Sequence, residues 1–218
     1  MLRIVAGEWR GRRIQAPRGR ATRPTAEKVR GAIFNVLAAR IELEGATVWD
    51  LFAGSGAMGI EALSRGARHA TFVEADPRAA AGIAGNLTRL GAPRERWTVA
   101  QARVETWLGR APASAGQLIV LIDPPYAAGE GERVLGRLAG MESVPRGAII
   151  VLESAVRAVP EPPAGLELMQ AKRYGDTGVH FLVKGPPADP FPDRTLRAGD
   201  GAGNPGGNAA DSETEDDA

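Results

Sequence analysis

The chain has 218 residues, 44% of them hydrophobic, and a formal net charge of +1, so it can bury one substantial core and is best interpreted as one domain with appendages. It contains no cysteine, which excludes disulfides and thiolate metal sites and agrees with a cytoplasmic location. No apolar run approaches the length of a membrane span, and the N-terminus lacks the apolar segment of a signal peptide, so we expect no membrane partner.

The beginning of the chain is strongly basic. Residues 1–30 contain nine arginines and lysines against two glutamates. Guanidinium groups bind phosphates bidentately and release counterions from a nucleic acid. This composition therefore predicts a surface for nucleic-acid phosphates, with a merely solvated basic face as the alternative. The residues that we expect to contact RNA are Arg10, Arg12, Arg13 and Arg23.

The same region predicts a small hairpin and a helix. Strand-like stretches at 3–6 and 12–14 flank Trp9, which would lie near the turn and either stack on a base or pack beneath the hairpin. Thr25 is a suitable N-cap for a helix that extends to Ala39. Arg23 precedes this helix in a segment that could also close over a cofactor. The apolar stripe of the helix consists of Val29, Ile33, Val36 and Leu37.

From residue 47 onward, strand and helix patterns alternate. This order predicts an α/β fold, a Rossmann-like doubly wound and mostly parallel seven-stranded sheet. The last two strands, joined by a short turn at 174–178, are expected to form an antiparallel C-terminal edge. We expect strands at 47–51, 70–74, 97–100, 118–122, 148–153, 166–172 and 179–184, and helices at 57–64, 77–90, 104–108 and 131–138.

These patterns divide the chain into three parts. Residues 1–40 would be a basic hairpin and helix that bind RNA, and 41–184 the α/β domain. Residues 185–218 are rich in glycine and proline and hold two arginines against eight acidic residues, so we expect a disordered acidic tail. Both histidines, His69 and His180, fall inside expected strands and far apart in sequence, so we expect no metal site.

A glycine-rich loop follows the first core strand. Gly54, Gly56 and Gly59 form a G-x-G-x-x-G pattern that opens a helix. Glu74 ends the second strand, 20 residues after Gly54, where a carboxylate binds ribose hydroxyls in nucleotide-binding folds. The loop therefore predicts a ligand that contains adenosine.

Charge discriminates between the possible ligands. Asp50 stands at the tip of the first core strand, where it would repel the pyrophosphate of a dinucleotide but attract the ammonium and sulfonium groups of S-adenosyl-L-methionine. Near the end of the third strand, Gln101 could accept a hydrogen bond from adenine N6 or could be an ordinary surface residue. The expected cofactor contacts are Asp50, Phe52, Gly54, Ser55, Gly56, Gly59, Glu74 and Gln101.

The sequence Asp123-Pro124-Pro125-Tyr126 closes the apolar run at 118–122. Two consecutive prolines fix two φ angles and bias Asp123 toward an extended conformation. They would form a rigid ledge that offers the Asp123 carboxylate and the Pro124 carbonyl as acceptors, with an aromatic face at Tyr126. Such a ledge suits a planar group that carries an NH2, although a plain proline turn after a strand is the alternative.

The acidic glycine loop, Glu74 and the Asp123-Pro124-Pro125-Tyr126 segment resemble the class I S-adenosylmethionine-dependent N-methyltransferases, whose motif at this strand end is (D/N)-P-P-(Y/F). The chain is further similar, over about residues 2–184, to the RsmD-type 16S ribosomal RNA guanine-N2 methyltransferases. The segments that carry this second similarity are 3–13, 22–25, 29–30, 34–35 and 61–67.

The resemblance implies transfer of a methyl group from S-adenosyl-L-methionine to the exocyclic N2 amine of one guanine in 16S rRNA, with S-adenosyl-L-homocysteine as the product. It implies a substrate within a 30S particle or an assembly intermediate, and it makes 41–184 the methyltransferase domain. We expect a monomer. The catalytic residues that it implies are Asp123, Pro124, Pro125 and Tyr126.

Positioning would supply most of the rate in such a reaction. If Asp123 and the Pro124 carbonyl accept from the amine, its nitrogen can pyramidalise and direct its lone pair at the methyl group. Tyr126 would stack on a base swung out of the RNA. Either Asp123 or water could take the departing proton.

Two kinds of alternative remain open at this point. The same ledge suits an N-methyltransferase that acts on another RNA, on DNA adenine or on a protein glutamine, although 218 residues show no DNA target-recognition domain. The alternative from another class is a non-catalytic protein that binds rRNA through its basic segment.

Overall fold

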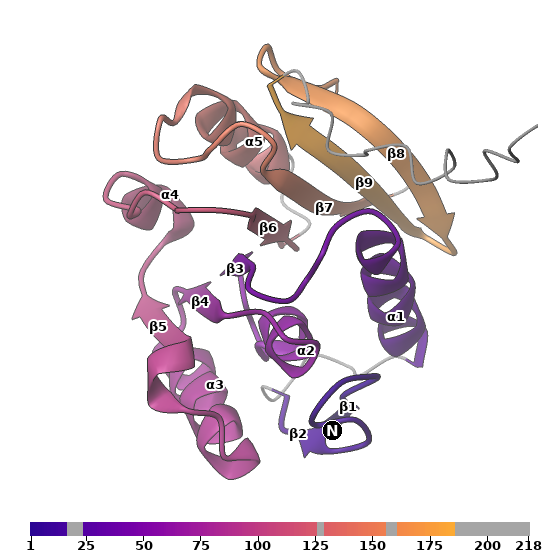
Figure 1. The fold of residues 1–218 in the computed structure, drawn as a ribbon, viewed down its shortest axis with the longest axis vertical. Coiled ribbons are helices and arrows are strands. Elements are labelled where there is room, and N and C mark those ends of the chain that lie inside the picture. Colours follow the sequence, from indigo (N-terminus) through magenta and orange to yellow (C-terminus); the bar gives the residue numbers. More distant parts are fainter. Residues whose placement is uncertain (17–23, 126–128, 156–160, 186–218) are drawn as a thin grey trace, which may run out of the picture.

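The computed structural model describes residues 1–16, 24–125, 129–155 and 161–185. At its centre lies a seven-stranded sheet with the strand order β5-β4-β3-β6-β7-β9-β8 (Figure 1). Its strands are β3 (Thr47–Leu51), β4 (His69–Glu74), β5 (Trp97–Gln101), β6 (Leu118–Ile122), β7 (Ile149–Ala155), β8 (Leu166–Tyr174) and β9 (Thr177–Lys184). The helices are α1 (Pro24–Ala38), α2 (Ala57–Ser64), α3 (Pro77–Leu90), the 3-10 turn η1 (Arg94–Arg96), α4 (Val104–Leu108) and α5 (Glu130–Gly140).

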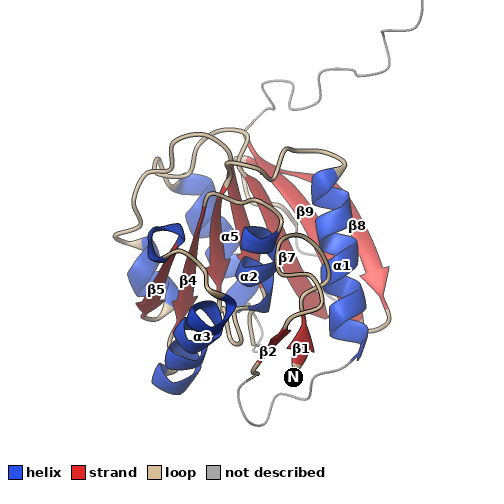
Figure 2. Ribbon diagram, turned by 60° about the horizontal axis from the view of Figure 1, so that its bottom comes forward, coloured by secondary structure: helices blue, strands red, loops and turns tan. Residues whose placement is uncertain are grey.

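The helices cover the two faces of the sheet as two layers. One apolar cluster joins the sheet to α1, α2 and α3, and a second joins its other face to α4 and α5 (Figure 2). All five residues of β6 are buried, as expected for a strand covered on both faces. The predicted doubly wound fold is confirmed. Within the described residues, no helix is long and apolar enough to cross a membrane.

The C-terminal edge of the sheet is antiparallel, as predicted. β7 pairs with β9 and β9 with β8, both antiparallel, while the pairs among β5, β4, β3, β6 and β7 are parallel. The last of the described strands thus lies between the two described strands that precede it. This insertion extends the sheet beyond β7 with two antiparallel strands.

The small N-terminal hairpin is also present. β1 (Leu2–Arg3) pairs antiparallel with β2 (Arg13–Ile14). Trp9 is only 4% exposed and belongs to the same apolar cluster as α1 to α3, and the Arg96 guanidinium lies 5.9 Å from its ring centroid. Of the two interpretations of Trp9, the structure shows packing beneath the hairpin.

Helix α1 begins at Pro24, one residue before the predicted cap at Thr25. Glu27 in its first turn accepts a hydrogen bond from the Arg3 backbone N–H at 2.9 Å. The first helix and the hairpin are therefore joined by a side chain as well as by apolar packing.

Candidate active site and cofactor cavity

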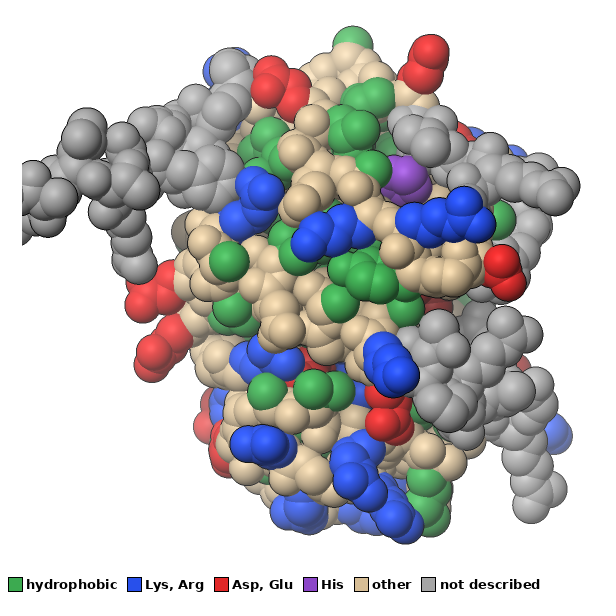
Figure 3. All heavy atoms as spheres, turned by 90° about the vertical axis from the view of Figure 1, so that its right-hand side faces the viewer, with side chains coloured by type: hydrophobic (Ala, Val, Ile, Leu, Met, Phe, Trp, Pro, Cys, Tyr) green, Lys and Arg blue, Asp and Glu red, His purple; other side chains and the backbone are tan. Residues whose placement is uncertain are grey.

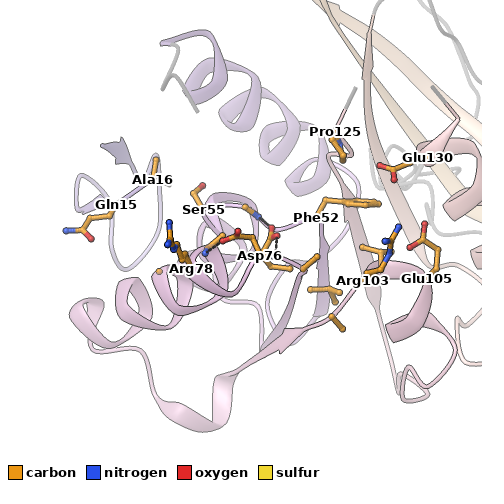
Figure 4. A pocket seen from close by; sticks show the side chains of 18 residues that line it. Gln15, Ala16, Phe52, Ser55, Asp76, Arg78, Arg103, Glu105, Pro125 and Glu130 are labelled. Atoms are coloured by element: carbon orange, nitrogen blue, oxygen red, sulfur yellow. Dashed lines mark hydrogen bonds between the residues drawn. The ribbon is translucent and has the colours of Figure 1, made fainter. Parts of the chain in front are cut away.

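A cavity of about 870 Å³ opens at the carboxyl ends of β3, β4 and β5. Ligands bind at this edge of parallel α/β sheets because loops and helix N-termini converge there. One end is formed by residues that follow the hairpin, and the other by the first turns of α4 and α5 (Figure 4). Its lining includes Gln15, Ala16, Phe52, Gly54, Ser55, Glu74, Asp76, Arg78, Arg103, Glu105, Pro125 and Glu130.

The three glycines of the loop have different roles. Gly54 and Gly56 have φ of 55° and 76°, a left-handed conformation in which a Cβ is strained. At Gly59 the constraint is packing, because a Cβ would lie 2.4 Å from Cε1 of Phe72 on β4. Only Gly54 of the three lines the cavity. Gly56 and Gly59 thus shape the loop and hold α2 against the sheet.

Phe52 also adopts the left-handed conformation, with φ of 61°. A non-glycine residue in this region costs about 1 to 2 kcal/mol, and such strain is concentrated at functional sites. The side chain lines the cavity, and Figure 4 shows its ring between Asp76 and Glu130. The strained backbone therefore presents an aromatic ring to the cavity.

Glu74 stabilises the glycine loop from the end of β4. One carboxylate oxygen accepts from the Gly54 backbone N–H at 2.7 Å, and the other accepts from the Asp76 backbone N–H at 2.8 Å. Asp76 in turn caps α3 by accepting from the Ala79 N–H at 2.8 Å. Glu74 lines the cavity with both of these neighbours, Gly54 and Asp76.

Asp50 is buried behind the loop. Its carboxyl oxygen accepts from the Gly59 backbone N–H at 2.8 Å. Burial raises the pKa of Asp50 to about 8, the Gly59 hydrogen bond opposes this rise, and the charges of Asp123 and Glu74 add to it. Asp50 contributes to a much smaller cavity of about 10 Å³ rather than to the large one.

The proline segment comes directly after β6. Asp123 is exposed, Pro124 is half-buried and Pro125 is exposed, and Pro125 lines the large cavity. Asp123 lines the small cavity together with Asp50. Helix α5 packs closely here, because a Cβ at Gly131 would lie 3.6 Å from Cγ of Pro124. Tyr126 lies outside the described residues.

The structure brings four of the eight predicted cofactor contacts together at the large cavity, whereas Asp50, Gly56, Gly59 and Gln101 are not part of its lining. Phe52, Gly54, Ser55 and Glu74 line one cavity with Pro125. Gln101 at the end of β5 is exposed and is not part of the lining, whereas the following residues Ala102 and Arg103 are.

Other lining residues were not anticipated from the sequence. They include Gln15, Ala16, Asp76, Arg78, Arg103, Glu105 and Glu130. Asp76 and Arg103 could have been predicted from the sequence, because each closely follows a strand that ends at the carboxyl edge of the sheet.

The basic residues of the hairpin differ in their contacts. Arg10 and Arg13 are exposed, whereas the exposed Arg12 donates a hydrogen bond to the Arg89 carbonyl at 2.9 Å. Basic side chains gather at the lower end of the molecule in Figure 3, the end at which Figure 1 shows the hairpin. Arg23 lies outside the described residues.

Comparison with known proteins identifies the family. The family model described as "Conserved hypothetical protein 95" matches residues 2–183. "Ribosomal RNA small subunit methyltransferase D" of Escherichia coli (strain K12) is 37% identical over 84% of this chain and 90% of its own length. "Putative rRNA methyltransferase YlbH" of Bacillus subtilis (strain 168) is 32% identical over 84% of this chain and 99% of its own. The solved structure "Putative methyltransferase yhhF from Escherichia coli" has a TM-score of 0.73 and 33% identity, covering 84% of this chain and 98% of that one. The chain therefore belongs to the Conserved hypothetical protein 95 family, the RsmD-type methyltransferases that its sequence resembles.

Proposed function

We propose that this protein transfers the methyl group of S-adenosyl-L-methionine to the exocyclic N2 amine of a guanine in 16S rRNA of the small ribosomal subunit. One observation carries the proposal: the glycine loop after β3 and the proline segment after β6 meet at one cavity, which Gly54 and Pro125 both line. The names of the relatives, which refer to rRNA and to the small ribosomal subunit, support the substrate.

The residues at the cavity fit S-adenosylmethionine. Glu74 has carboxylate lone pairs beyond those that accept from Gly54 and Asp76, so it can also accept from ribose hydroxyls. Phe52 and Pro125 offer flat apolar surface to an adenine ring. Bound there, S-adenosylmethionine supplies an activated methyl group on a sulfonium.

A dinucleotide fits less well. Pyrophosphate binds to the free backbone N–H groups at a helix N-terminus. In this protein the Gly59 N–H, in the first turn of α2, already donates to the buried carboxyl of Asp50. A ligand without phosphate that carries positive charge agrees better with Asp50, on which the charges of Asp123 and Glu74 also act.

The proline segment would position the acceptor amine. Asp123 is exposed at the sheet edge, beside Asp50 at the small cavity. Its carboxylate and the Pro124 carbonyl accept from the N2 amine and orient the nitrogen lone pair, which is conjugated with the ring in free guanine. Tyr126 stacks on the base. This role requires geometry rather than strong acid–base chemistry.

The basic hairpin would hold the rRNA. Arg10 and Arg13 are exposed on the hairpin, and Gln15 and Ala16 continue from it into the cavity lining. We therefore assign 1–40 to RNA binding and 41–184 to methyl transfer, and treat 185–218 as a separate acidic tail. We take the working enzyme to be a monomer acting on a 30S particle or an assembly intermediate.

The direct test is methylation with labelled S-adenosylmethionine. The purified protein is incubated with naked 16S rRNA, 30S subunits or DNA, and the products are digested to nucleosides. N2-methylguanosine from 16S rRNA, free or in particles, is the expected product. Methyladenine from DNA would support another acceptor, and the absence of N2-methylguanosine from every RNA sample would overturn the proposal.

Asp123→Ala tests the role of the proline segment. We expect the turnover number to fall by about 100-fold or more, the scale of losing one positioned polar group at a reacting centre. The affinities for S-adenosylmethionine and for RNA should change little. Asp176→Ala, an exposed acid in the turn between β8 and β9, is the matched control. Full activity of Asp123→Ala would remove Asp123 from the mechanism.

A further inference from the structure

Glu153 lies beside Asp123 at the carboxyl edge of the sheet. The parallel strands β6 and β7 pair Ile122 with Leu152, so Asp123, which directly follows β6, comes beside Glu153 on β7. Both residues line the small cavity, together with Asp50 and Met58. A second carboxyl group therefore stands next to the one that the proposed reaction uses.

The carboxyl group of Glu153 forms no hydrogen bond with any described residue. Burial raises its pKa to about 8, and the charges of Asp123 and Asp50 raise it further, while the charge of Arg30 lowers it. The Arg30 guanidinium donates to Glu61 and to the Arg3 carbonyl. Glu153 is half-buried, so its carboxyl group is within reach of a donor on a substrate that binds beside Asp123.

Guanine presents a suitable partner. Its N2 amine is next to a ring N1–H, so two donors lie side by side on the same edge. In adenine and cytosine the ring nitrogen next to the amine carries a lone pair instead. A carboxyl oxygen placed beside the amine-binding group therefore meets a donor only in guanine.

We propose that Glu153 accepts a hydrogen bond from the N1–H of the target guanine while Asp123 accepts from its N2 amine. This inference rests on the proposed function and makes Glu153 a residue that selects guanine. A carboxylate accepts the N1–H with either oxygen. A protonated carboxyl accepts it with its carbonyl oxygen and can also donate to guanine O6.

The experiment compares guanine with 2-aminopurine at the methylated position. The wild-type enzyme first locates its target by labelling 16S rRNA, and the particle is then rebuilt with either base at that position. 2-Aminopurine keeps the amine on C2 but has a lone pair at N1 and no O6. The quantity measured is kcat/KM for guanine divided by kcat/KM for 2-aminopurine. This ratio shows how strongly the enzyme recognises the N1–H.

We expect Glu153→Ala to lower this ratio by about 10- to 100-fold, the effect of losing one good base contact. The loss should fall on guanine, with little change for 2-aminopurine. Glu153→Gln should keep most of the guanine activity, because its amide carbonyl accepts the same N1–H. The intrinsic reactivities of the two amines cancel in the comparison of variant with wild type.

Glu167→Ala, at an exposed position on the edge strand β8, is the matched control and should leave the ratio unchanged. If Glu153→Ala does not fold, Glu153→Met provides the same loss of acceptor with an apolar side chain of similar length. A folded variant with a wild-type ratio would overturn the role of Glu153 alone. Absence of N2 methylation by the wild-type protein would instead overturn the proposed function.

Discussion

The Glu61 carboxylate on α2 accepts a hydrogen bond from the Val5 backbone N–H at 2.8 Å. Its other oxygen accepts from the Ala6 N–H at 3.0 Å. Glu61 is fully buried and also pairs with Arg30 on α1 at 3.4 Å and with Arg65 at 2.8 Å. One carboxylate therefore links the hairpin, the first helix and the core. It also balances the positive charges of two arginines that are largely buried.

Replacing this carboxylate should be costly. Glu61→Ala leaves Arg30 buried without its partner and two backbone N–H groups without acceptors, so we expect a loss of about 3 to 5 kcal/mol in the free energy of unfolding. Urea denaturation measures it, with Glu132→Ala on the exposed face of α5 as control. A loss below about 1 kcal/mol would show that the contacts of Glu61 contribute little to the stability of the fold.

Two glycines on helices should respond in opposite directions to alanine. At Gly59 the new Cβ would overlap Phe72, and overpacking of this kind costs about 1 to 3 kcal/mol. At Gly136 on α5 no atom lies within 4 Å of the new Cβ, so Gly136→Ala should stabilise the helix by about 0.5 to 1 kcal/mol. Denaturation midpoints measure both, and equal effects at the two positions would contradict the packing role of Gly59.

Asp50 makes stability dependent on pH. Its pKa rises from 3.8 in the unfolded chain to about 8 in the fold, so the folded protein holds a proton between these values that the unfolded chain releases. The free energy of unfolding should therefore fall as the pH rises through this window. Asp50→Asn keeps an acceptor for the Gly59 N–H but does not titrate, and its stability should fall less between about pH 5 and about pH 8. Thermal unfolding at both pH values checks this, and an unchanged slope would contradict it.

The same variant should bind S-adenosylmethionine less tightly. A cationic ligand favours the ionised form of a nearby carboxyl group, and the amide in Asp50→Asn cannot ionise. Calorimetry should show a larger loss of affinity for S-adenosylmethionine than for S-adenosylhomocysteine, which lacks the sulfonium charge. Equal losses for the two ligands would mean that Asp50 acts only through the shape of the loop.

The hairpin arginines should determine the salt dependence of RNA binding. Each phosphate contact contributes about 0.7 to 0.9 to the slope of log K against log salt. Arg10→Ala combined with Arg13→Ala should therefore flatten this slope by about 1 to 2. Arg137 on α5 is also exposed. Arg137→Ala is the control, because it removes the charge of an arginine outside the hairpin. An unchanged slope would leave the hairpin as a solvated surface.

Local patterns predicted the elements well because the decisive signals are short. The bounds of α2, α3, α4, β3 and β6 agree with the sequence expectations residue for residue. Gly91 is in the left-handed conformation at the end of α3, and Asp76 with Pro77 begins that helix. Such caps depend on a few adjacent residues and can be recognised without tertiary information.

Long-range contacts could not be predicted in the same way. The bonds from Glu61 to Val5 and Ala6 span more than 50 residues, and no periodicity marks that glutamate as buried. The prediction for Gln101 was limited for a similar reason. It placed the cavity contact one residue too early, because Ala102 and not Gln101 lines the cavity. Which residue at a strand end faces a cavity depends on strand register and loop geometry. The pattern of apolar residues does not specify either of these.

Gln15 and Ala16 form part of the cavity wall directly after the hairpin strand β2. Gln15 is held there by Asn86 of α3, which accepts from its backbone N–H and donates to its carbonyl, each at 2.9 Å. The surface proposed for RNA and the cavity proposed for the methyl donor thus share one short piece of backbone. If RNA shifts that backbone, the affinities of the two ligands are coupled, and reciprocity then requires each ligand to change the affinity of the other by the same factor.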